Sequence, residues 1–158
     1  MRIGITGHRG LPEEVAVWTR AALRAEVSRT APEALVGVSC LADGPDSWFA
    51  RTVLELGGRL EVVIPADDYR GLLPAEQHAE YDALLAAAAQ VHHTGLAVAD
   101  DQALMTASEV LVGLVDRLLA VWDGEPARGF GGTGDVVTYA RQVDLPVRVL
   151  WPQGARRG

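Results

Sequence analysis

The chain has 158 residues, which is typical of one domain, and 49% of them are hydrophobic, enough for a buried core. Its formal net charge is −7, which argues against a nucleic-acid partner, because such proteins normally carry a basic face. No apolar run is long enough to span a bilayer, so we expect no membrane partner.

The first elements are a strand, a glycine-containing loop and a helix. Residues 2–6 indicate a short buried strand and not a signal peptide. Pro12 and two acidic residues then mark the start of a helix that ends before Pro32. Residues 35–40 are a second apolar run. This strand ends on Cys40, the one cysteine, which favours a reducing, cytoplasmic environment.

The rest of the chain repeats this alternation. Asp46 is expected to cap the next helix. Further strands are expected at residues 60–64, 91–94, 118–122 and 147–151, and helices at 47–56, 75–90, 101–115 and 136–143. Strands that alternate with helices predict a mostly parallel sheet of about six strands with helices on both faces. We therefore expect one Rossmann-like α/β domain over residues 1–152 and a frayed tail over 153–158.

Three loops should converge on the carboxyl ends of these strands: residues 7–10, 42–46 and 123–135. The last is rich in glycine and precedes a helix expected to begin near Thr133. Unpaired N–H groups and the helix dipole at such a terminus favour an anion. A flexible glycine turn is the alternative.

Other residue types narrow the chemistry further. The chain has no lysine, so a Schiff base and a P-loop lysine are excluded. Arg9 suits a phosphate or carboxylate, and His8 could share that anion; the alternative is that Arg9 pairs with a surface acid. The spacing of Gly4, Gly7 and Gly10 differs from the dinucleotide fingerprint, which argues against a nicotinamide oxidoreductase.

Two further pairs of polar residues, one of aspartates and one of histidines, are considered as possible site residues. Asp67 and Asp68 form a solvated turn or accept from ribose hydroxyls. His92 and His93 are adjacent and should point to opposite faces of a strand, so we interpret them as structural. No cluster has metal-ligand spacing, and we expect no metal site.

Three motifs together resemble the ligand loops of the SLOG superfamily, which includes the Lonely Guy phosphoribohydrolases and the DNA-processing protein A family. They are Thr6-Gly-His-Arg9, Ser39-Cys-Leu-Ala-Asp-Gly-Pro-Asp46 and Gly131-Gly-Thr-Gly-Asp135. The resemblance covers nearly the whole chain and implies a Rossmann-like fold that binds a nucleotide or a nucleotide-derived ligand. The chain departs from the Lonely Guy motif, whose leading proline, threonine and catalytic glutamate fall on Phe130, Asp135 and Thr138.

Two functions stay open at this point. The first is a nucleotide binder with its phosphate on the Gly131–Gly134 loop; the second is an N-glycoside hydrolase or transferase that uses an aspartate, Asp135 or Asp46. Ligand contacts are expected from Gly7, His8, Arg9, Gly44, Asp46, Asp123, Gly131, Gly132, Thr133 and Gly134. No cofactor is expected to be required, and Mg²⁺ would arrive only on the nucleotide's own phosphates.

A homodimer is also expected. Apolar residues surround most of the segment 103–115, and a helix that is apolar nearly all round is buried on more than one side. The Lonely Guy resemblance implies dimers that pack through helices. Burial of this segment under the chain's own 75–90 helix is the alternative.

Overall fold

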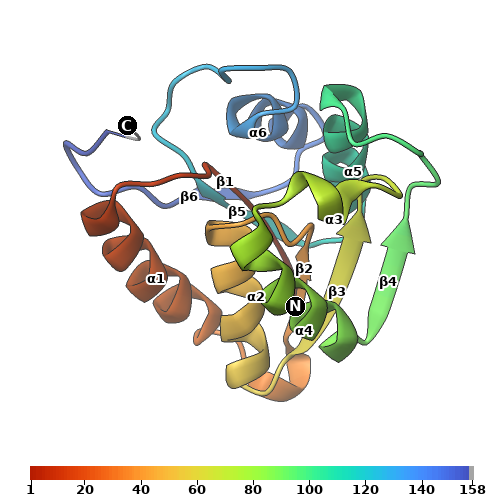
Figure 1. The fold of residues 1–158 in the computed structure, drawn as a ribbon. Helices are drawn as coiled ribbons and strands as arrows, with labels where there is room; N and C mark the ends of the chain where they lie inside the picture. The colour runs from red at the N-terminus through yellow and green to blue at the C-terminus, as the bar shows by residue number, and fades with distance from the viewer. Residues whose placement is uncertain (157–158) are drawn as a thin grey trace.

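The computed structural model describes residues 1–156, so the last two residues of the predicted 153–158 tail lie outside the described part. Six strands alternate with helices along the chain (Figure 1). The strands are β1 (Arg2–Gly7), β2 (Val36–Ser39), β3 (Arg59–Ile64), β4 (Gln90–His93), β5 (Arg117–Val121) and β6 (Val147–Val149). The helices are α1 (Glu13–Val27), α2 (Pro45–Glu55), α3 (Tyr69–Leu72), α4 (His78–Ala87), α5 (Asp101–Gly113) and α6 (Thr133–Gln142), with 3₁₀ turns at Pro32–Ala34 and Ala75–Gln77.

All strand pairs are parallel, and the strand order is β4-β3-β2-β1-β5-β6. The order runs outward from β1 to β4 on one side and from β5 to β6 on the other. The direction of winding therefore reverses between β1 and β5, which pair from Ile3↔Arg117 to Gly7↔Val121. In open α/β sheets, ligands bind outside the carboxyl ends of the strands at such a reversal.

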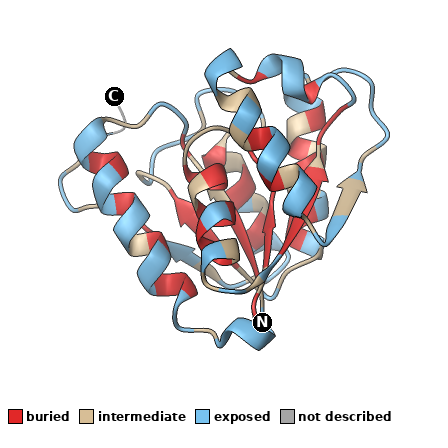
Figure 2. Cartoon of the chain, turned by 60° about the horizontal axis from the view of Figure 1, so that its bottom comes forward, coloured by how far each residue is buried: buried red, intermediate tan, exposed pale blue. Residues whose placement is uncertain are grey.

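Helices cover both faces of the sheet, as predicted, and its central strands are mostly buried, whereas the edge strands β4 and β6 are not (Figures 1 and 2). On one face, α1 and α2 pack on Ile3, Ile5 and Leu119. On the other face, α5 and α6 pack on Val38, Val63 and Leu118. Because side chains alternate along a strand, β5 contributes Leu119 to the first core and Leu118 to the second.

Several boundaries differ from the predictions. Pro45 is the first residue of α2 and Gly44 precedes it, so Asp46 lies in the first turn and is not the cap. Proline suits the first helical position, and Gly44 has φ +91°, where glycine is favoured. The predicted 75–90 helix is a 3₁₀ turn followed by α4, and the short helix α3 was not predicted.

Candidate functional site

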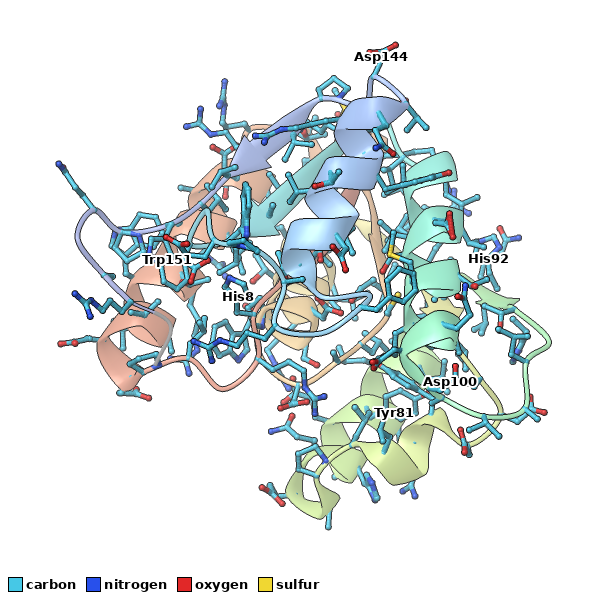
Figure 3. All side chains as sticks on the ribbon, turned by 90° about the horizontal axis from the view of Figure 1, so that it is seen from above. His8, Tyr81, His92, Asp100, Asp144 and Trp151 are labelled. Carbon is cyan, nitrogen blue, oxygen red and sulfur yellow. The ribbon has the colours of Figure 1, made fainter. Side chains whose placement is uncertain are left out.

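The two loops at the reversal point are joined directly. The N–H of His8, just after β1, donates to the Val121 carbonyl at 3.1 Å. The His8 Nε2 atom lies 3.2 Å from the Asp123 Oδ1 atom and 3.3 Å from the Asp123 backbone nitrogen. Trp151, after β6, meets the His8 ring edge-on with ring centroids 5.8 Å apart (Figure 3). His8 is therefore held in one orientation between β5 and the C-terminal segment.

A cavity of about 450 Å³ opens beside His8. Its volume is in the range of pockets that hold small organic ligands. Its walls come from the ends of β1 and β2, from α3, from α5 and from the loop before α6. The lining residues are Ile5, Thr6, Gly7, His8, Arg9, Cys40, Ala42, Asp46, Pro65, Tyr69, Leu72, Asp101, Leu104, Ser108, Leu111, Arg128, Gly129, Phe130, Gly131, Gly132, Thr133 and Val136.

Seven of the predicted ligand residues line this cavity: Gly7, His8, Arg9, Asp46, Gly131, Gly132 and Thr133. Gly44, Asp123 and Gly134 do not line the cavity. Gly44 packs near the backbone of Arg9, and Asp123 holds His8. Gly134 lies close to the backbone of Ala127, where a Cβ atom would be only 2.8 Å from its nitrogen.

Arg9 combines both roles left open by the sequence. It lines the cavity, and it also pairs with Asp43, whose Oδ1 atom lies 2.6 Å from both Nε and one terminal nitrogen. The Arg9 side chain is 46% exposed, so an exposed pair of this kind contributes little stability. Arg9 can therefore turn to an anionic ligand at small cost.

Asp46 is the most deeply buried carboxyl group of the cavity wall, with 8% of its surface exposed. Burial raises its pKa to about 7, and the Ala42 N–H, 3.4 Å from Oδ2, opposes that shift only weakly. Its other oxygen has no hydrogen-bond partner within residues 1–156. A ligand hydroxyl or amine could donate to this oxygen.

The glycine loop uses part of its own hydrogen-bonding capacity. The Gly131 N–H donates to the Asp135 carboxylate at 3.0 Å, and the Gly132 N–H donates to the Gly129 carbonyl at 3.1 Å. Two of the four N–H groups predicted to meet an anion are therefore engaged. The N–H groups of Thr133 and Gly134 have no acceptor in the part of the chain that the structure describes.

The loop glycines are also required by packing. A Cβ atom on Gly131, where φ is +87°, would lie 2.9 Å from the Asp101 carbonyl of α5. One on Gly132 would lie 3.0 Å from the Ala127 Cβ atom. The loop is thus a close-packed turn seated on α5.

Asp135 and Thr138 occupy the positions of the Lonely Guy threonine and catalytic glutamate, and neither lines the cavity. The Asp135 carboxylate binds the Gly131 N–H, and the Thr138 hydroxyl donates to the Gly134 carbonyl of its own helix at 2.9 Å. Asp135 therefore stabilises the loop.

Much of the outer cavity wall was not predicted. It includes Tyr69, Leu72, Asp101, Leu104, Arg128 and Phe130. In the sequence, an apolar residue that lines a cavity cannot be distinguished from one that packs in the core. Arg128 and Phe130 could have been found, because they lie within the glycine-rich segment already singled out.

The remaining polar pairs have structural partners. Asp68 accepts from the Ala99 N–H at 2.7 Å, and neither it nor Asp67 lines the cavity. The His92 Nε2 atom lies 2.9 Å from Glu61, which also pairs with Arg2. Arg2 lowers the pKa of Glu61. Within residues 1–156, no group of three or more His, Cys, Asp or Glu residues is placed to hold a metal ion.

A six-stranded parallel sheet with the cavity at its reversal point defines a Rossmann-like fold. No family model and no curated protein sequence matches the chain. Among solved structures, it is similar to DNA processing protein A from Streptococcus pneumoniae, with a TM-score of 0.69 and 16% identity. The similarity covers 97% of this chain and 51% of that one, so the chain spans about half of its length.

Two other structures show the same likeness. DNA processing protein A from Helicobacter pylori gives a TM-score of 0.69 at 16% identity, over 100% of this chain and 68% of that one. The molybdenum cofactor carrier protein of Chlamydomonas reinhardtii gives 0.56 at 18% identity, over 94% and 74%. The Rossmann-like fold implied by the three sequence motifs is therefore confirmed.

One predicted exclusion is wrong. Net charge argued against a nucleic-acid partner, yet the Helicobacter protein of this fold binds single-stranded DNA. The net charge averages over the whole surface and therefore does not exclude locally basic regions; in this chain Arg9 and Arg128 line the cavity. Among the helices of residues 1–156, none is long and apolar enough to cross a bilayer.

Proposed function

We propose that the protein binds a nucleotide or a nucleotide-derived molecule in the cavity at the reversal point. The observation that supports this most is that a backbone N–H group, free within residues 1–156, and an arginine that can exchange its surface partner both line the cavity. The first turn of α6 offers the N–H group of Thr133, which lines the cavity, and Arg9 offers an exposed guanidinium. Together they suit the phosphate of the ligand. Asp46 lies in the same cavity and suits a ligand hydroxyl.

N-glycoside hydrolysis is not favoured by this geometry. Asp135 already binds the loop, and Thr138 bonds to its own helix. Of the two aspartates considered for catalysis, only Asp46 lines the cavity, and burial keeps it partly protonated near neutral pH. We therefore propose a binding protein. Incubation with nucleoside monophosphates should release no free base.

Calorimetric titration tests the binding proposal. Nucleoside 5′-monophosphates should bind more tightly than the corresponding nucleosides, because only the former place a charge at Arg9 and α6. Arg9→Ala should lose about 1.5–3 kcal/mol of affinity for the monophosphates, the usual range for a charged hydrogen bond. Because the pair with Asp43 must be given up on binding, the lower end is expected.

Arg24→Ala is the matched control. Arg24 also pairs with an acid on the surface, at 3.0 Å from Glu55, with 53% of its side chain exposed, but it lies outside the cavity. Equal affinities for nucleosides and their monophosphates would contradict the proposal. If a short single-stranded DNA bound far more tightly than any mononucleotide, the ligand of the cavity would be a polynucleotide and not a mononucleotide. Chelator should leave mononucleotide affinity unchanged when no Mg²⁺ is added.

A further inference from the structure

The cavity has a second end whose chemistry differs from that of the phosphate end. Two large apolar side chains that line it are about half exposed, Phe130 at 53% and Leu72 at 48%. They come from different elements, the loop before α6 and the helix α3. The aromatic contacts of residues 1–156 include none made by the Phe130 ring.

The elements that carry these two side chains both lie next to α5 residues of the cavity wall. Gly131, next to Phe130, is seated on the first turn of α5 against the Asp101 carbonyl. One turn further along α5, Leu104 lines the cavity and packs against the core cluster that contains Tyr69 and Leu73 of the α3 region. Phe130, Leu104 and Leu72 all line this cavity.

From this arrangement we infer that Phe130 and Leu72 hold a flat heteroaromatic ring, the base of the ligand. This inference rests on the proposed nucleotide function. It places the base at Phe130 and Leu72, and the phosphate at Arg9 and the first turn of α6. Exposing apolar side chains in a cavity wall is unfavourable in water, and a planar ring that covers both would remove them from solvent. Aromatic side chains stack on every base, because each base has a π-face.

The inference also states a ligand class. Contacts to a ring face discriminate poorly between bases, since they do not depend on the pattern of hydrogen-bond donors and acceptors. The ligands should be nucleotides with an intact base, and sugar phosphates should bind weakly. Purines should bind more tightly than pyrimidines, because they bury more apolar surface.

The test compares adenosine 5′-monophosphate with ribose 5-phosphate by calorimetry. Wild type should bind the nucleotide about 5- to 140-fold more tightly, the range that corresponds to stacking of one base. Phe130→Ala should reduce nucleotide affinity to that of ribose 5-phosphate and leave the affinity for ribose 5-phosphate unchanged. Phe130→Trp should retain the preference, and Leu72→Ala should lose part of it.

Val143→Ala is the matched control, because Val143 is 50% exposed and lies at the other end of α6, away from the cavity. It should leave both affinities unchanged. Equal binding of the two compounds to wild type would overturn the inference while leaving the phosphate site intact. If Phe130→Ala weakened the binding of both compounds equally, the inference would also be overturned, because Phe130 would then stabilise the loop and not contact the base. If neither compound bound to wild type, the proposed function itself would fail.

Discussion

Asp46 is a buried acid in a cavity proposed to hold an anion, so its protonation should matter for folding. Its pKa of about 7 in the folded chain compares with 3.8 for an ordinary aspartate. Between these values the folded chain keeps a proton that the unfolded chain releases. The contribution of Asp46 to the free energy of unfolding is therefore greatest below about pH 4 and is lost as the pH rises through about 7.

Asp46→Asn should remove this dependence. Urea unfolding between pH 4.5 and 8.5 should show the variant gaining stability relative to wild type as the pH rises, with a constant difference only above about pH 8. Asp82→Asn is the control, because hydrogen bonding to Arg70 lowers the pKa of the exposed Asp82, and its effect falls below this window. Parallel curves for wild type and Asp46→Asn would show that Asp46 titrates at its ordinary pKa.

At the level of elements, the sequence was most informative where burial decides the pattern. The apolar strands 2–6 and 118–122 lie between two helical layers, and each of the six strands overlaps a segment predicted to be a strand. Parallel strands bring their carboxyl ends to one edge, which is why the predicted loops at Arg9 and Gly131 do share a cavity. The wall formed by α3 and α5 depends on tertiary packing and could not be predicted from local patterns.

The seat of the glycine loop on α5 leads to a prediction about Gly131. Gly131 and Gly124 have nearly the same φ, +87° and +84°, but a Cβ atom on Gly124 would have no neighbour within 4 Å. Alanine at either position should cost roughly 1–2 kcal/mol because of the left-handed backbone. Gly131→Ala should lose about 1–3 kcal/mol more, because its Cβ atom would overlap the Asp101 carbonyl.

Chemical denaturation of the two alanine variants measures this difference. Nucleotide affinity should fall in Gly131→Ala and stay close to wild type in Gly124→Ala, since only the first displaces the cavity wall. A valine in place of Gly132 would be a poor probe of the anion site, because its side chain would meet Ala127 before it met any ligand. Equal losses of stability in the two alanine variants would mean that the loop separates from α5 without cost.

For the whole molecule, the structure changes the argument for a homodimer. The apolar residues of α5 are covered within one chain by the sheet and α6, with Leu111 2% and Val112 4% exposed. The alternative cover, residues 75–90, lies on the opposite face with α2. Among the large apolar residues of α5, Val110 is the exposed one, at 38%. Association through helices stays a prediction, and α5 no longer provides its main support.

Sedimentation equilibrium at micromolar concentration tests the dimer, and a single species at 16.8 kDa would end that prediction. Leu111→Asp should unfold the chain, because it buries a charge in the core, and it should not yield a folded monomer. Val110→Asp is the variant that probes the surface of α5. It should remain folded, and loss of a wild-type dimer in this variant would place the contact on α5.

The pairing of β1 with β5 also has a consequence for how the chain is made. His8 and Asp123 are 115 positions apart, and the strands they follow are neighbours in the finished sheet. Translation proceeds at roughly 5–20 residues per second, so one edge of β1 stays unpaired for on the order of 6–20 seconds. During that time an apolar strand edge is open to pairing with another nascent chain. Slow synthesis of the first 121 residues should therefore increase aggregation, and the cavity can form only after β5 has left the ribosome.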